Sequence, residues 1–92
     1  GVNILSSDQE SMARVFGRSG PDKFAGIDWT PGPKGSPLIE GALAHLEGRI
    51  ELVTSQGDHD IVVVTVEYGV SHHGAPLVFY RGRFAGFDGI EK

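Results

Sequence analysis

Two strand-like runs joined by a tight turn constrain the fold of this chain more than any other feature. Residues 42–53 have a period of two, which predicts a strand whose core face carries Ala42, Ala44, Leu46, Gly48, Ile50 and Leu52. Most of the alternate set, which includes His45 and Glu47, is predicted to face water. Ile61–Val66 is rich in β-branched valine and predicts a strand covered on both faces. Gly57-Asp58-His59 ends one run and opens the next, so we expect a hairpin with His59 at its mouth.

The remaining segments predict short elements. Val2 and Ile4 indicate a strand, and Ser7 with Glu10 has the spacing of a helix-capping box. Residues 30–37 hold three prolines and two glycines, which favours a loop, and residues 77–80 form another apolar strand. Short strands, hairpin-like connections and two short helices are typical of a mainly β barrel with helical decoration.

Composition excludes several classes of function. The formal net charge of −4 argues against general affinity for nucleic acid. The chain has no cysteine, which excludes disulfides and thiolate metal sites. No apolar run approaches the roughly 20 residues that a membrane span requires. We therefore expect a soluble, cytoplasmic protein without a membrane or nucleic-acid partner, and an anionic ligand would have to meet local positive charge or backbone donors.

His59 is the first candidate for ligand contact. An imidazole at the mouth of a hairpin can donate a hydrogen bond to a carboxamide or phosphate oxygen, and Asp58 can form the turn and orient the ring. The alternative is a solvated turn residue, and the tripeptide alone favours that alternative.

Arg81 and Phe84 form the second candidate group. If residues 80–84 continue a strand, Arg81 and Arg83 share one face, and Gly82 allows a close backbone approach to a ligand. The alternative is a strand that ends in solvated arginines, and we favour it for Arg83.

Other polar and aromatic residues are weaker candidates. Asn3 lies at the end of the first strand and Ser6 follows that strand. Polar side chains at such positions often form hydrogen bonds only with the backbone. Phe24 and Trp29 could cover a planar ring but also suit a core. The pair His72-His73 has no third ligand at useful spacing, so no metal site is predicted.

Six segments in this order resemble the flavin reductase family, the NAD(P)H-dependent components of two-component flavin monooxygenases. The resemblance covers residues 1–87 and is strongest to reductases that serve aromatic-ring and steroid-ring hydroxylases. The segments are Gly1–Ser6, Asp8–Arg18, Pro21–Trp29, Ser36–Gly41, Gly57–His59 and Pro76–Gly82.

The resemblance implies an FMN-binding split β-barrel with short helices, in which NADH or NADPH reduces FMN or FAD. The reduced flavin then diffuses to a partner monooxygenase that hydroxylates aromatic or steroid-derived substrates. The resemblance places His59 and Asp58 near the nicotinamide, Arg81 and Phe84 near the flavin, and the segment of Asn3 and Ser6 past the flavin. It also implies a homodimer with the flavin at its interface. No catalytic side chain is predicted, because the cofactors carry the hydride chemistry.

The resemblance further implies that residues 1–92 are the C-terminal portion of a single domain, incomplete at its N-terminus. The first strands and a Ser/Thr-rich phosphate loop would precede Gly1. No Gly-x-Gly-x-x-Gly fingerprint is present, which disfavours a Rossmann fold. Two alternatives remain: a non-catalytic flavin-binding split-barrel protein, and a small β interaction domain that recruits a partner by strand addition.

Overall fold

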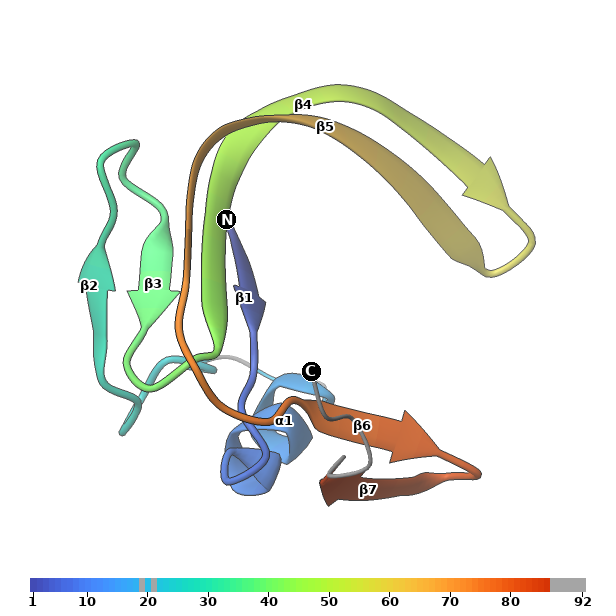
Figure 1. Ribbon diagram of the computed structural model, residues 1–92. Coiled ribbons are helices and arrows are strands. Elements are labelled where there is room, and N and C mark those ends of the chain that lie inside the picture. Colours follow the sequence, from blue (N-terminus) through green and yellow to red (C-terminus); the bar gives the residue numbers. More distant parts are fainter. Residues whose placement is uncertain (19, 21, 87–92) are drawn as a thin grey trace.

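The computed structural model describes residues 1–18, 20 and 22–86, and this part of the chain is mainly β, as predicted (Figure 1). It contains a single helix, so the prediction of two helices is wrong for the described residues. The helix is α1 (Glu10–Phe16), and the strands are β1 (Val2–Ile4), β2 (Trp29–Pro31), β3 (Pro37–Ile39), β4 (Ala44–Gln56), β5 (His59–Ser71), β6 (Leu77–Tyr80) and β7 (Arg83–Gly86).

The predicted hairpin is the largest element. β4 and β5 pair antiparallel from Ala44↔Ser71 to Gln56↔His59, and β1 adds to the other edge of β4. Gly57 has φ 63° at the first position of the two-residue turn, as a type II′ turn requires. The register shifts between Glu47 and Gly48 and between Ile50 and Leu52. Bulges bend a strand, and the hairpin arches over the rest of the molecule (Figure 1).

A second hairpin, β6–β7, corrects one prediction. Tyr80 pairs with Arg83, and Arg81 and Gly82 between them have φ 53° and 75°. Positive φ at both central positions is the geometry of a type I′ turn. Residues 80–84 are therefore a turn rather than a continuous strand, and Arg81 does not share a strand face with Arg83.

The core is small. Leu38, Ile39 and Ala42 are its buried apolar residues, and the buried polar residues are Gln9 and Glu47. The apolar side chains of the arch are exposed within this chain, for example Ile50 (63%), Leu52 (56%), Ile61 (52%), Val63 (48%) and Val66 (57%). The prediction that Ile50 and Leu52 lie on a core face is therefore wrong for this single chain, because its described residues leave both side chains exposed.

The start of α1 also differs from its prediction. Gln9, not Ser7, is the N-cap. The Ser6 backbone N–H donates to Gln9 Oε1 at 3.0 Å, and the Gln9 N–H donates to the Ser6 carbonyl at 3.0 Å. Ser6 also forms an isolated antiparallel bridge with Pro76, which ties the segment before α1 to the segment before β6.

Candidate functional site

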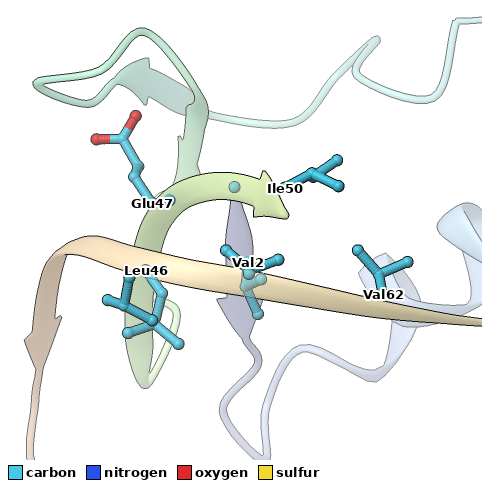
Figure 2. A pocket seen from close by; sticks show the side chains of 9 residues that line it. Val2, Leu46, Glu47, Ile50 and Val62 are labelled. Atoms are coloured by element: carbon cyan, nitrogen blue, oxygen red, sulfur yellow. The ribbon is translucent and has the colours of Figure 1, made fainter. Parts of the chain in front are cut away.

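The concave face of the arch encloses an apolar pocket of about 450 Å³ (Figure 2). β1, β4 and β5 contribute its lining: Gly1, Val2, Leu46, Glu47, Gly48, Ile50, Val62, Val64 and Val66. Successive side chains of a strand point to opposite faces, so Ile61, Val63 and Thr65 face away from this pocket. Both faces of the distal hairpin are therefore apolar, and neither is covered by the described residues of this chain.

Glu47 is the most buried side chain beside this pocket, with 1% exposure. Its Oε1 accepts the Lys34 backbone N–H at 3.1 Å, and its Oε2 accepts the Ser36 N–H at 2.8 Å. Leu46 and the Glu47 carboxylate point in opposite directions from β4 (Figure 2). Burial alone would raise the pKa of Glu47, but the hydrogen bonds from Lys34 and Ser36 outweigh it and hold the pKa below its usual value.

The prediction that Glu47 faces water is wrong. The strand period places it opposite Leu46, as expected, but the β2–β3 connection folds over that side of β4. A Cβ on Gly32 would collide with the Glu47 carboxylate, so the close approach requires a glycine. The Lys34 ammonium adds a 3.8 Å contact with Glu67 on β5. The glycine and proline content of residues 30–37 predicted a loop but not its carboxylate partner.

Asn3 binds backbone groups of β3 with both ends of its amide. Its Nδ2 donates to the Pro37 carbonyl at 3.1 Å, and its Oδ1 accepts the Ile39 N–H at 2.9 Å. These bonds hold β3 against β1. They match the backbone-bonding alternative, and contact of Asn3 with a cofactor stays a prediction.

A second pocket, of about 300 Å³, lies beside Asn3 and has aromatic walls. Its lining includes Leu5, Phe16, Phe24 and Ile39. The rings of Phe16 and Phe24 meet edge to face at 5.2 Å, and Phe24 and Trp29 are 5.7 Å apart. Phe24 and Trp29 are 40% and 42% exposed, so their rings remain accessible to a planar ligand.

His59 and Asp58 lie at the tip of the β4–β5 hairpin, as predicted. Their side chains are 84% and 94% exposed, and His59 Nε2 lies 3.3 Å from Asp58 Oδ1. The carboxylate thus orients the imidazole without burying it. The ring is free to meet a ligand that arrives at the hairpin tip.

Arg81 and Phe84 lie on the β6–β7 hairpin. The Arg81 guanidinium stacks over Tyr80 at 5.5 Å, and its Nε donates to the Tyr80 hydroxyl at 3.2 Å. Phe84 packs against Phe79 at 4.9 Å and beneath Arg14 of α1 at 5.3 Å. Arg81 therefore lies in the turn of the hairpin and Phe84 lies on β7. The role of both residues in cofactor binding stays a prediction.

Ser6 is tied to neighbouring groups. Its hydroxyl donates towards Asp8 Oδ1 (2.5 Å) and also lies 3.1 Å from the Gly41 carbonyl. In Figure 1 the tip of the β4–β5 hairpin stands apart from the β6–β7 hairpin. Among the described residues, no cluster of three His, Cys, Asp or Glu side chains suits a metal ion. Nor does the described part contain a helix long and apolar enough to cross a membrane.

The model of the flavin reductase-like domain family matches residues 1–88. The reductase subunit HsaB of a flavin-dependent monooxygenase from Rhodococcus jostii is 43% identical over 88 residues, which are 95% of this chain and 45% of that protein. The 4-hydroxyphenylacetate 3-monooxygenase reductase component from Klebsiella oxytoca is 36% identical, over 90% of this chain and 52% of that protein. The chain spans about half the length of the curated relatives it matches.

Solved structures agree with these relatives. Nitrilotriacetate monooxygenase component B from Mycobacterium thermoresistibile matches with a TM-score of 0.84 and 42% identity, over 94% of this chain and 50% of that one. The NADH:FAD oxidoreductase SgcE6 from Streptomyces globisporus, solved with NAD and FAD fragments, matches with a TM-score of 0.86 and 36% identity, over 95% of this chain and 54% of that one. These matches confirm the predicted split-barrel class.

Proposed function

The chain belongs to the flavin reductase-like domain family, and on that premise we propose that it works in an NAD(P)H:flavin oxidoreductase. The observation that carries the proposal is the 43% identity to a monooxygenase reductase subunit across 95% of this chain. The FMN reductase RutF from an Enterobacter species is also 43% identical, over 91% of the chain and 54% of that protein. The activity proposed is transfer of a hydride from NADH or NADPH to FMN or FAD.

The residues of the chain suit such ligands. Flavin and nicotinamide nucleotides combine planar rings with phosphates, and the chain offers accessible aromatic rings at Phe24 and Trp29 and an exposed guanidinium at Arg81. When bound, the two nucleotides supply the hydride chemistry themselves. The work of the protein is to hold and orient them, and we assign the nicotinamide end to His59, oriented by Asp58.

Both FMN and FAD remain candidates. A relative at 36% identity was solved with NAD and FAD fragments, and another is named an FMN reductase that uses NADH. Since a reductase of this type releases its flavin to a second protein, we propose that the flavin is a substrate rather than a resident group. NADH is the favoured donor because both of these relatives are named for it.

We also propose a homodimer. Both faces of the distal β4–β5 hairpin are apolar, so another protein surface must pack against each face to shield it from water. A site that contains both His59 and Arg81 needs a second copy, because the two hairpins stand apart in one chain (Figure 1). In the proposed dimer, His59 of one protomer meets the nicotinamide that lies beside the flavin held by its partner.

The partner in the proposed reaction is a separate monooxygenase that receives the reduced flavin by diffusion. Two relatives are named reductase components of such systems, one of them for 4-hydroxyphenylacetate. We propose an aromatic or steroid-derived substrate for the monooxygenase served by this chain.

NADH oxidation tests the proposed function. The purified protein is mixed with NADH and either FMN or FAD, and the fall in NADH absorbance is followed without oxygenase. Flavin-dependent oxidation supports the proposal. Flavin binding without oxidation would instead indicate a non-catalytic flavin-binding protein, and absence of flavin binding would favour an interaction domain.

A further inference from the structure

Side chains, rather than another strand, hold the outer edge of β3. β3 pairs with β2 on one edge, in a sheet of two strands. On its other edge, the Ile39 N–H donates to Asn3 Oδ1 at 2.9 Å, and the Ile39 carbonyl oxygen lies 2.7 Å from His45 Nε2. The Asn3 amide also donates to the Pro37 carbonyl at 3.1 Å. β1 and β4 therefore fix β3 through three hydrogen bonds made by two side chains.

Both of these side chains are half-buried, which corrects the prediction that His45 is solvated. A carbonyl oxygen only accepts, so His45 Nε2 carries the proton in this bond. The His45 ring meets the His72 ring edge to face at 5.9 Å, which fixes its orientation. Loss of a partly buried hydrogen bond leaves its partner group unsatisfied, so these bonds resist displacement of Ile39.

Ile39 connects this anchoring to the aromatic residues of the chain. It is the cross-strand partner of Trp29 on β2. The Trp29 ring lies 5.7 Å from the Phe24 ring, and Phe24 and Ile39 both line the pocket of about 300 Å³. Cross-strand neighbours are in contact, so a displacement of Ile39 would also displace Trp29 and, through it, Phe24.

We propose that Asn3 and His45 are positioning residues for the flavin. They hold Ile39, and through Ile39 they keep Trp29 and Phe24 in the arrangement that accepts a planar ring. This inference rests on the proposed reductase function, in which those two aromatic rings are offered to a nucleotide. A wall that is already ordered does not have to be ordered when the ligand binds, so its loss weakens binding. The nucleotides carry the hydride chemistry, so the rate of the chemical step should change little.

Trp29 is the only tryptophan of the chain, so tryptophan fluorescence reports directly on this wall. Asn3→Ala removes two of the three bonds and should shift the Trp29 emission to longer wavelength as the ring becomes more hydrated. The KM for the flavin should rise about tenfold, as expected for two lost hydrogen bonds, while kcat and the KM for NADH change less than about twofold. Gln56→Ala removes an exposed amide and is the control, which should change neither the emission nor the flavin KM.

Two substitutions of His45 test the third bond separately, and they test the proposal even if Asn3→Ala does not fold. His45→Phe keeps an aromatic ring beside His72 but cannot donate to the Ile39 carbonyl. It should change the Trp29 emission and the flavin KM in the same direction as Asn3→Ala, by a smaller amount. His45→Gln has an amide that can donate in place of the imidazole, and it should preserve both values.

The proposal is overturned if Asn3→Ala and His45→Phe leave the Trp29 emission and the flavin KM unchanged. A fall in kcat at constant flavin KM would also overturn it, because that result would assign these residues to the chemical step. Failure of the proposed function is a separate observation, namely no flavin-dependent NADH oxidation by the original protein. The Trp29 emission is recorded without flavin or NADH, so the anchoring of Trp29 is tested independently of activity.

Discussion

The Oε2 atom of Glu47 and the backbone nitrogen of Ser36 are 2.8 Å apart, and this bond joins the two-stranded β2–β3 sheet to the β4–β5 hairpin. A second bond from the Lys34 N–H completes the cradle around the carboxylate. A charged side chain that accepts two backbone bonds while buried stabilises the loop only in its ionised form.

Acid should therefore loosen the β2–β3 connection. The folded-state pKa of Glu47 lies below the reference value of 4.5, so its contribution to stability is fully present above about pH 4.5. That contribution is lost as the pH falls through the lower folded-state pKa. Glu47→Gln should lower the melting temperature at pH 7 and flatten the acid side of the stability profile, measured by circular dichroism. Glu51→Gln, an exposed carboxylate on the same strand, is the control and should preserve the acid transition of the original chain.

His59→Ala should weaken the use of NADH while leaving flavin affinity nearly unchanged. Loss of one charge-assisted hydrogen bond costs about 1.5–3 kcal/mol, or roughly ten- to a hundredfold in the apparent constant for NADH. Steady-state kinetics in the protein that oxidises NADH measure the effect. Gln56→Ala changes the cross-strand neighbour of His59 and should have little effect. Loss of flavin binding in His59→Ala, with intact NADH kinetics, would contradict this division of roles.

Gly57→Ala should destabilise the β4–β5 hairpin. At φ 63° an alanine Cβ crowds the backbone, at a cost of about 1–2 kcal/mol. Urea unfolding should show a lower midpoint. Asp58→Ala changes the other turn residue, which does not have positive φ, and should shift the midpoint less. Equal shifts for the two variants would show that the turn geometry is not the cause.

Ile61→Lys should disrupt self-association. Ile61 lies on the face of the hairpin opposite the apolar pocket and is 52% exposed, so a charge there should oppose burial against a second copy. Sedimentation velocity measures the change, and we expect a dimer for the original chain and a monomer for the variant. Thr54→Lys, which replaces the polar cross-strand partner of Ile61, is the milder control. A monomeric original chain at micromolar concentration would contradict the proposed dimer.

The sequence predicted the parts of the fold that depend on local pattern. The hairpin around Gly57 follows from a glycine turn between two strand-like runs, and residues 77–80 form the strand expected from their apolar character. The local sequence pattern gave a wrong prediction where the burial of a side chain depends on backbone groups that are distant in the sequence. Glu47 belongs to the face predicted to be polar, but its partners are amide groups of a loop earlier in the chain.

The candidate site was predicted less completely than the fold. The turn at Arg81 was missed because a non-glycine residue with positive φ is uncommon, and the residue type gave no signal for it. The half-burial of His45, which was predicted to be solvated, was missed because its ring meets that of His72, and these two residues are far apart in the sequence and meet only through strand pairing. The position of Asp58 and His59 at the tip of the hairpin was predicted correctly, because the glycine turn between two strand-like runs defines that tip. Their contact with a nicotinamide stays a prediction.

The bridge between Ser6 and Pro76 has a consequence for the order of folding. The β4–β5 hairpin pairs residues that are close in sequence, and hairpins form in about 1–10 μs. The bridge joins residues near opposite ends of the described chain, so its closure carries a much larger loss of chain entropy. We therefore expect amides of β4 and β5 to gain protection from hydrogen exchange early in refolding. The Ser7 and Leu77 amides, which flank the bridge, should be protected last.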